Sequence, residues 1–134
     1  MSSKNLPILA LVPVTTEGLS LTPELVDDGL IVRLKGNADS TVNDAFAAFI
    51  TRLHAEAQRV KAANVRVDLT ELYFMTSSSI RCFVTWIGFI REAPFAQRYS
   101  LTFVVNPALR WQKRNLDILV QLSPDLVTFN ESTA

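Results

Sequence analysis

The stretch that decides the fold is Val65–Arg91, with the sequence VRVDLTELYFMTSSSIRCFVTWIGFIR. Its first five residues alternate apolar and polar side chains, so we expect a central strand with both faces largely covered. From Ser78 onward, apolar residues recur every third or fourth position, as they do in an amphipathic helix. Four consecutive hydroxyl side chains, Thr76 to Ser79, lie between the two patterns. The segment therefore predicts a strand that passes into a helix, with hydroxyl groups at the junction.

This junction is a favourable place for a negative charge. Ser and Thr are preferred N-caps because their oxygens accept hydrogen bonds from free N–H groups of the first turn. Those N–H groups and the helix dipole stabilise an anion by ~0.3–1 kcal/mol at exposed sites. A phosphate on one of the serines would be compatible with the fold, and it would change the surface charge by roughly −1.5 to −2.

The same residues resemble the signature of the STAS domain of bacterial anti-sigma-factor antagonists. That signature is a DLS-like strand end, a short link, and then (F)(M/I/V)-D-S-S-G-(L/I). The residues that match in register are Asp68, Leu69, Thr70, Phe74, Met75, Ser77, Ser78 and Ile80. The sequence departs from the signature at Thr76, where an acidic residue is usual, and at Ser79, where glycine is usual.

The resemblance implies a phosphoprotein that works by partner switching in transcription regulation. In the family the second serine of the pair is phosphorylated, which is Ser78 here, with Ser77, Ser79 and Thr76 as alternatives. A serine kinase, which can itself be the anti-sigma factor, would modify it, and a metal-dependent serine phosphatase would reverse the modification. The unmodified form would bind the anti-sigma factor and so free the sigma factor.

By the same resemblance, the partner surface surrounds the junction. The segment Gly36–Asp39 looks like a family loop that lies near the phosphorylation site, although its residues alone would favour an ordinary turn. The candidate partner-binding residues are Asn37, Asp39, Thr76, Ser77, Ser79, Arg81, Thr85 and Trp86.

Composition limits the class of protein. The 134 residues fit one domain, and a hydrophobic content of 49% is enough for a core. A net charge of +0 offers no electrostatic footprint for nucleic acid or an anionic membrane. The single cysteine, Cys82, excludes an internal disulfide. The apolar run Leu6–Val14 is short, contains prolines and lacks a cleavage site, so we expect a cytoplasmic protein without a signal peptide.

The remaining chain predicts alternating strands and helices. Ile8–Val14 is interpreted as an extra edge strand within an N-terminal extension, residues 1–18. Asp27-Asp28-Gly29 predicts a hairpin between Pro23–Val26 and Leu30–Lys35. We therefore expect an α/β, STAS-like mixed sheet over residues 19–130, with helices packed mainly on one face. Residues 131–134 are expected to form a frayed tail.

Local signals predict where the other helices begin and end. Thr41–Asp44 resembles a capping box at the start of the first helix, and Asn64 is a candidate C-cap at its end. Asn106-Pro107 predicts the start of the last helix, and Leu126–Phe129 the final strand.

The helix after the hydroxyl cluster carries a second apolar set, Cys82, Trp86 and Phe89, beside its core stripe. Two interpretations stay open. Another segment covers this set, with the N-terminal extension as the obvious cover, or the set is a partner surface, which includes a homodimer.

Catalysis is not expected, and neither is a cofactor or a metal. A nucleophilic serine needs a base within hydrogen-bond reach, but the only histidine, His54, lies on another helix and is expected at the surface or its boundary. The G-x-S-x-G pattern is also missing. The alternative function is a non-catalytic STAS scaffold or a subunit of a signalling or transporter assembly, because one fold serves several roles.

Overall fold

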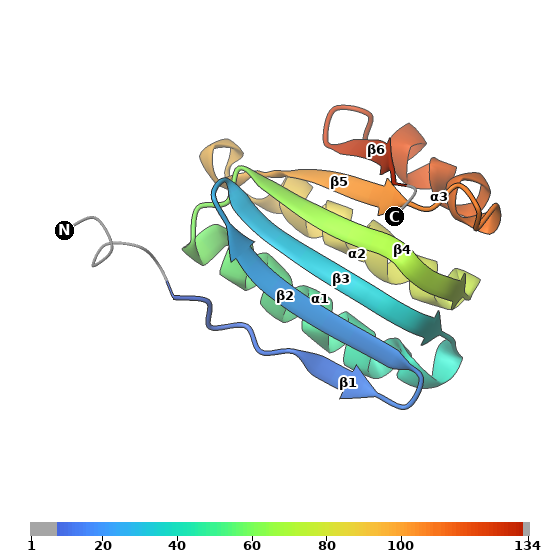
Figure 1. The fold of residues 1–134 in the computed structure, drawn as a ribbon. Coiled ribbons are helices and arrows are strands. Elements are labelled where there is room, and N and C mark those ends of the chain that lie inside the picture. The colour runs from blue at the N-terminus through green and yellow to red at the C-terminus, as the bar shows by residue number, and fades with distance from the viewer. Residues whose placement is uncertain (1–7, 133–134) are drawn as a thin grey trace.

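The computed structural model describes residues 8–132, so Met1–Pro7 of the expected extension and the last two residues lie outside it. Within the described residues, a sheet of six strands, in the order β1-β2-β3-β4-β5-β6, carries three α-helices (Figure 1). The strands are β1 (Val14–Thr16), β2 (Leu19–Val26), β3 (Gly29–Ala38), β4 (Asn64–Met75), β5 (Ser100–Val105) and β6 (Val127–Glu131). The helices are α1 (Asn43–Arg59), α2 (Ser77–Glu92) and α3 (Trp111–Leu122), with short 3-10 turns η2 (Ser40–Val42) and η3 (Phe95–Gln97).

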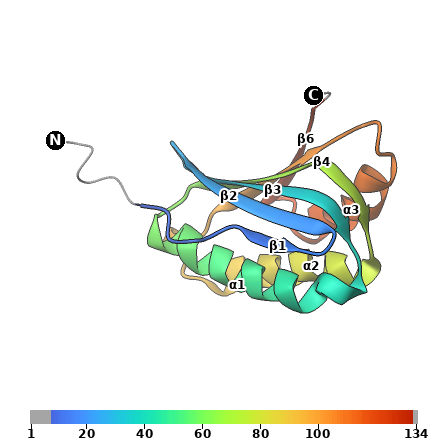
Figure 2. The same cartoon turned by 60° about the horizontal axis from the view of Figure 1, so that its bottom comes forward.

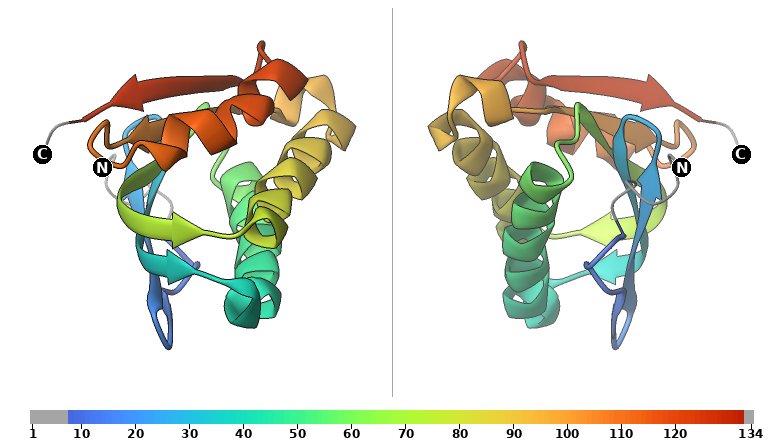
Figure 3. Two further views of the ribbon diagram at one scale, coloured as in Figure 1. Left: turned by 90° about the vertical axis from the view of Figure 1, so that its right-hand side faces the viewer. Right: turned by 90° about the vertical axis from the view of Figure 1, so that its left-hand side faces the viewer.

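The order of the strands decides where the helices lie. β1, β2 and β3 pair antiparallel, and β3 through β6 pair parallel. Because β-α-β crossovers are right-handed and the strand order never reverses, the helices accumulate on one face. Figure 2 shows α1 and α2 side by side beneath the sheet, and the end-on views in Figure 3 show the opposite face open. The expected mixed α/β sheet with helices mainly on one face is confirmed. Within residues 8–132, no helix is long and apolar enough to cross a membrane.

Val65–Leu69 lies in a central strand, as expected, but only one of its faces is covered. Val65, Val67 and Leu69 are at most 1% exposed, whereas Arg66, on the other face, is exposed. The neighbouring Arg33 pairs there with Asp68 at 3.8 Å. The expectation of two covered faces is wrong because no crossover returns the chain to the open face.

The hairpin at Asp27–Asp28 is confirmed, and Gly29 is the first residue of β3. A Cβ atom at Gly29 would lie 1.9 Å from the carbonyl oxygen of Asn64. Close approach of the β3 and β4 backbones therefore requires glycine at this position.

The expected strand over Ile8–Val14 is wrong, since β1 covers only Val14–Thr16. Pro13 has no N–H to donate, so the ladder with β2 ends at the pair Val14–Leu21. The segment before it leaves the sheet and lies along α1. There the Ala10 N–H donates to Glu56 Oε2 at 2.7 Å, and Leu11 is buried in the core.

The second apolar set of α2 contacts α1 and the residue before β5, and the expected cover by the N-terminal extension falls partly outside the described residues. Trp86 is fully buried, and its Nε1–H donates to the hydroxyl of Tyr99 at 2.7 Å. The same hydroxyl lies 2.6 Å from His54 Nδ1 on α1. The Phe89 ring contacts the His54 ring with centroids 5.5 Å apart. His54 is therefore a boundary residue that connects α1 to the core of α2.

The ends of α1 differ from the expected ones. Asp39, rather than Thr41, provides the cap, and it caps η2 by accepting from the Thr41 N–H at 2.9 Å. At the other end Lys61 adopts a left-handed conformation, φ 55°, and closes the helix. Asn64 is therefore the first residue of β4 rather than a C-cap.

The last two elements are shifted along the chain. Asn106 Oδ1 accepts from the Ala108 N–H at 2.9 Å and forms a turn, so α3 begins only at Trp111. β6 continues to Glu131, and the Ser132 N–H donates to the Val105 carbonyl at 2.9 Å. The expectation of a frayed tail over residues 131–134 is therefore wrong for Glu131 and Ser132.

Side-chain amides hold the second half of β4, which has left β5 after Asp68. Gln112 is fully buried, and its Nε2 donates to the carbonyls of Leu69 at 2.6 Å and Leu72 at 3.0 Å. Its Oε1 accepts from the Asn106 N–H at 2.8 Å. Gln112 thus provides the hydrogen bonds that β5 no longer supplies.

We expect Gln112→Leu to lower the free energy of unfolding by at least about 2 kcal/mol, because it leaves buried carbonyls and an N–H unpaired. Urea unfolding of the full chain measures the change. The matched control is Gln121→Leu on the exposed side of the same helix, which loses only a bond to Asp117 and should change stability by at most about 0.5 kcal/mol. Equal effects of the two variants would contradict this role for Gln112.

The contact of His54 makes stability depend on pH. The Tyr99 hydroxyl accepts from Trp86, and it can donate its own proton to Nδ1 of a neutral His54 in the tautomer that leaves this nitrogen unprotonated. Burial lowers the pKa of His54, so protons bind more tightly to the unfolded chain. Stability from this group is fully present above the unfolded pKa, about 6.5, and falls as the pH drops below that value.

The test compares the wild type with His54→Asn, which keeps an acceptor near the position of Nδ1 but does not titrate. Between pH 7.5 and pH 5.5, the free energy of unfolding should fall more steeply for the wild type. Parallel curves for the two proteins would show that His54 does not carry this dependence.

Candidate functional site

The candidate site lies where β3 and β4 end. In an open sheet with parallel strands, the carboxyl ends of the strands form the usual place for a ligand or partner. Ala38 and Met75 are paired as the last residues of the two strands, and the Thr76 N–H donates to the Ala38 carbonyl at 3.0 Å. α2 begins immediately afterwards, with Thr76 as its N-cap, accepting from the Ser79 N–H at 3.2 Å. The predicted strand-to-helix junction is present.

Four side chains at this junction form a closed circuit of hydrogen bonds, which we call the hydroxyl ring: Asn43, Thr76, Ser78 and Ser79. Asn43 Nδ2 donates to Ser78 Oγ at 2.8 Å, and Ser78 Oγ lies 3.1 Å from Thr76 Oγ1. Thr76 Oγ1 donates to Ser79 Oγ at 3.0 Å, and Ser79 Oγ donates to Asn43 Oδ1 at 2.7 Å. The ring joins the start of α1 to the start of α2.

The hydroxyl groups differ in accessibility. Ser77 is exposed, Thr76 and Ser78 are partly buried, and Ser79 is 0% exposed. Ser79 Oγ also lies 3.1 Å from the Ala38 carbonyl, beneath the surface. Ser79 was an expected partner-binding residue and an alternative phosphorylation site, and its burial makes both assignments wrong.

Two other expected residues lie at the same edge. Asn37 is exposed near the end of β3, and its N–H donates to the Gly18 carbonyl at 2.7 Å. The Asp39 carboxylate accepts from the hydroxyl and the N–H of Thr41, which lowers its pKa, so it carries its charge beside the ring. The structure thus brings Asn37 and Asp39 together with Thr76, Ser77 and Ser78, as the sequence predicted.

The expected partner-binding residues further along α2 differ in their exposure. Trp86 is fully buried, so its assignment as a partner-binding residue is wrong. The helical pattern left open whether this side of α2 is covered or faces a partner, and the structure shows Trp86 covered, with its Nε1–H bonded to Tyr99. Arg81 and Thr85 are exposed, and they line a small hollow of about 140 Å³ between α1 and α2. They lie about one and two turns beyond Ser78, roughly 5 and 11 Å along the helix.

Sequence reasoning missed three residues of this region. Tyr73 and Phe74 are 51% and 50% exposed, and Phe74 is paired with Asn37 in the ladder. Strand alternation would have buried one of them, but β4 is irregular at these positions. Asn43 was expected only as an interior residue of a capping box. The signal that could have identified it is its amide type, which donates and accepts at once.

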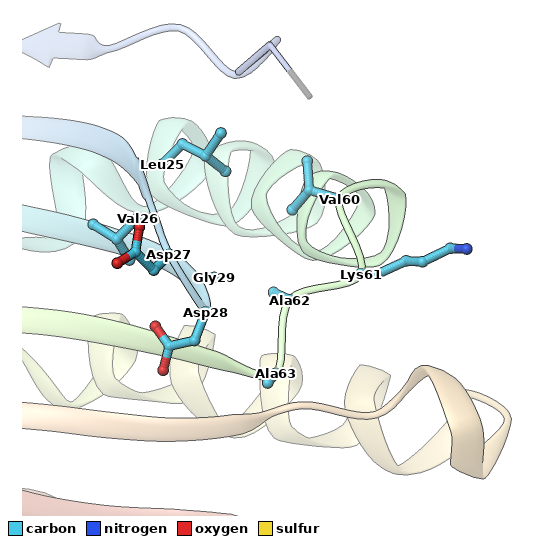
Figure 4. Close-up of a pocket in the computed structure, with 9 residues that line it drawn as sticks. All are labelled: Leu25, Val26, Asp27, Asp28, Gly29, Val60, Lys61, Ala62 and Ala63. Carbon is cyan, nitrogen blue, oxygen red and sulfur yellow. The ribbon is translucent and has the colours of Figure 1, made fainter. Parts of the chain in front are cut away.

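Another hollow, of about 470 Å³, lies at the opposite end of β3, between the β2–β3 hairpin and the loop after α1 (Figure 4). Lys61 points away from Asp27 and Asp28 there, so the charged side chains of this hollow do not converge (Figure 4). It is separated from the hydroxyl ring by the length of β3.

The hydroxyls of the site can accept a group. The only histidine bonds to Tyr99 rather than to a serine. Among residues 8–132, no three His, Cys, Asp or Glu side chains are grouped so that they could hold a metal ion. What the site offers is a pair of accessible hydroxyls at a helix start, with two half-exposed aromatic rings in the preceding strand.

Comparison with known proteins identifies the fold. No protein-family model matches the chain. No curated protein matches it. Among solved structures, an anti-sigma factor antagonist from Mycobacterium paratuberculosis superposes with a TM-score of 0.61 and 16% identity, over 85% of this chain and 88% of that chain. The STAS domain of an antisigma-factor antagonist from Rhodobacter sphaeroides superposes with a TM-score of 0.51 and 19% identity, over 66% and 88%. The chain therefore has the fold of STAS-domain anti-sigma-factor antagonists, as the motif around Ser78 predicted.

Proposed function

We propose that this protein is a phosphorylatable interaction switch, similar to an anti-sigma-factor antagonist, and that Ser78 is the modified residue. The observation that carries the proposal is the placement of Ser77 and Ser78 in the first turn of α2, on a STAS fold, at the edge where the parallel strands end. The protein would act by binding rather than by catalysis. Its role would lie in partner switching that controls transcription in the bacterial cytoplasm.

The start of α2 suits a phosphate. Ser78 is the second residue of the helix, where backbone N–H groups are free and the dipole is positive. A phosphate there adds roughly −1.5 to −2 charges without placing a negative charge in the core, because Ser78 remains partly exposed. The fold should therefore survive modification, while the surface changes.

The proposed partner surface combines this turn with its exposed neighbours. Half-exposed aromatic side chains such as Phe74 are typical anchors of interfaces. Asn37, Ser77 and Arg81 would provide polar contacts around it. By resemblance, the partner is an anti-sigma factor with serine kinase activity, and a serine phosphatase resets the switch. Neither nucleic acid nor a membrane is a proposed partner.

A second candidate function is a non-catalytic scaffold within a signalling or transporter assembly. The observation in its favour is that the hydroxyls of Thr76 and Ser79 both form hydrogen bonds within the hydroxyl ring. Thr76 thus presents no carboxylate at the position where the antagonist signature has one. In a scaffold, the ring would serve only to fasten α1 to α2.

Binding to a kinase-type partner separates the two functions. The partner for the test is a candidate GHKL-type serine kinase, sought among the neighbouring genes, purified and supplied with ATP and Mg²⁺. Ser78→Ala should bind it like the unmodified parent. Ser78→Asp should bind at least about thirtyfold more weakly, because a buried unpaired charge costs on the order of 2 kcal/mol. Ala48→Asp, which adds the same charge at an exposed position of α1, is the control and should bind normally.

Phosphopeptide mapping after the kinase reaction decides the position of the modification. We expect phosphate on Ser78. Modification of Ser77 alone would move the switch by one residue and contradict the assignment. No phosphate at all, together with equal binding by Ser78→Ala and Ser78→Asp, would support the scaffold instead.

A further inference from the structure

We propose that Asn43 is a positioning residue that holds Ser78 in the closed hydroxyl ring and so restrains its phosphorylation. The hydroxyl ring has to open before Ser78 can accept a phosphoryl group, and it cannot close in the same way afterwards. Modification of Ser78 thereby loosens the start of α1. This role depends on the proposed switch for its biological use, whereas the ring can be tested on the protein without any partner.

The hydrogen bonds of the ring can all run in one direction when Ser79 turns its single proton to Asn43 Oδ1 at 2.7 Å rather than to the Ala38 carbonyl at 3.1 Å. The Ser79 N–H donates to Thr76 Oγ1, and Thr76 turns its own proton toward Ser79 Oγ. Ser79 donates to Asn43 Oδ1, and the Asn43 amide donates to Ser78. The proton of Ser78 is left to point at Thr76 Oγ1. All donors therefore run the same way round, an arrangement in which hydrogen bonds strengthen one another.

Asn43 is the only member of the ring outside the α2 junction. It is the first residue of α1, it is partly buried, and it lies 35 positions before Ser78 in the chain. An amide is the side chain that can accept from one hydroxyl and donate to another at the same time. Asn43 thus converts a local cap of α2 into a link between two helices.

The chemistry of phosphoryl transfer conflicts with the closed ring. Ser78 Oγ forms a bond to the γ-phosphorus of ATP, the bond from that phosphorus to the bridging oxygen breaks, and ADP leaves. The serine proton passes to the base of the kinase. In the ring this proton faces Thr76, and one lone pair of Oγ accepts from Asn43. The bond that Ser78 donates to Thr76 must therefore break, and the Asn43 amide still occupies one of the two lone pairs of Oγ, while the exposed Ser77, outside the ring, meets neither constraint.

Modification also prevents the ring from re-forming. A phosphoserine has no hydroxyl proton, so it cannot donate to Thr76. Its anionic oxygens attract the Asn43 amide as a charge-assisted acceptor and draw it away from Ser79. By linkage, the coupling acts in both directions. A partner that displaces Asn43 would therefore make Ser78 easier to modify.

The first test is a double-mutant cycle on the full chain, made of Asn43→Ala, Ser78→Ala and the double variant. The effects on the folding equilibrium constant should depart from additivity by about fivefold to tenfold, since both residues share one network. The matched control replaces Ser78→Ala by Ser77→Ala, and that cycle should be additive within about twofold. Additive effects in the Asn43–Ser78 cycle would overturn the proposal.

The second test needs no destabilising substitution. Phosphoserine is placed at position 78 of the full chain, or at position 77 as the control, and amide hydrogen exchange is followed at residues 43–46. With phosphoserine at 78, exchange there should be about tenfold faster than in the unmodified protein, as expected for local opening of the helix start. With phosphoserine at 77, it should be unchanged. Equal exchange rates for the two modified proteins would overturn the proposal.

Neither test uses a kinase or a partner, so the two proposals can fail separately. Loss of the binding difference between Ser78→Ala and Ser78→Asp would refute the switch and leave the ring intact. Unchanged amide hydrogen exchange at the start of α1 would refute the positioning role of Asn43 and leave the switch intact.

Discussion

Beyond Asp68, β4 has no backbone neighbour on its β5 side, and the buried amide of Gln112 takes that neighbour's place. The carbonyls of Leu69 and Leu72 would otherwise face the core without donors, which the interior of a protein rarely tolerates. Everything that gives the candidate site its shape follows from this constraint. The amide fixes the end of β4, β4 delivers Thr76 to the Ala38 carbonyl, and α2 starts at a defined place.

The same constraint explains why the polar network at the site is complete. Gln112 holds the C-terminal part of β4 from the α3 side. The hydroxyls that follow this strand therefore lie within hydrogen-bond distance of one another and of Asn43. A partly satisfied network would destabilise the protein more than an apolar contact would. Two amide side chains, Gln112 and Asn43, thus support the site from opposite sides. One does so in the core, and the other at the surface.

The fold was largely predictable, because its signals are local or follow from topology. Alternation in Val65–Leu69, the hairpin at Asp27–Asp28 and the apolar periodicity of α2 all depend on neighbours in sequence. The open face of the sheet was missed, because apolar alternation shows that one face is buried but does not show what lies on the other. The prolines of Ile8–Val14 indicate a strand at an edge of the sheet, whereas in the structure Pro13 ends the ladder and the strand begins only after it.

The site was predictable in place but not in detail. The hydroxyl cluster identified the helix start, and the resemblance brought Asn37 and Asp39 to it. The sequence could not show how deeply each hydroxyl is buried. Ser77, Ser78 and Ser79 are identical neighbours in the sequence, but in the structure they range from exposed to fully buried. Trp86 was misjudged for the same reason. Asn43 was missed because its contacts join residues 35 and 36 positions apart.

The departure of the chain from the sheet at Pro13 also affects how molecules of this protein associate in concentrated solution. Within residues 8–132, no strand pairs with the outer side of β2 beyond Leu21, and such an edge is a template on which a second molecule can add a strand. Pro23 lies in that stretch while the ladder to β3 continues on both sides of it, so its missing N–H faces outward. An incoming strand would find a gap in the donor row just where the edge becomes free. Pro23 therefore opposes edge-to-edge pairing at the stretch of β2 that the departure at Pro13 leaves free.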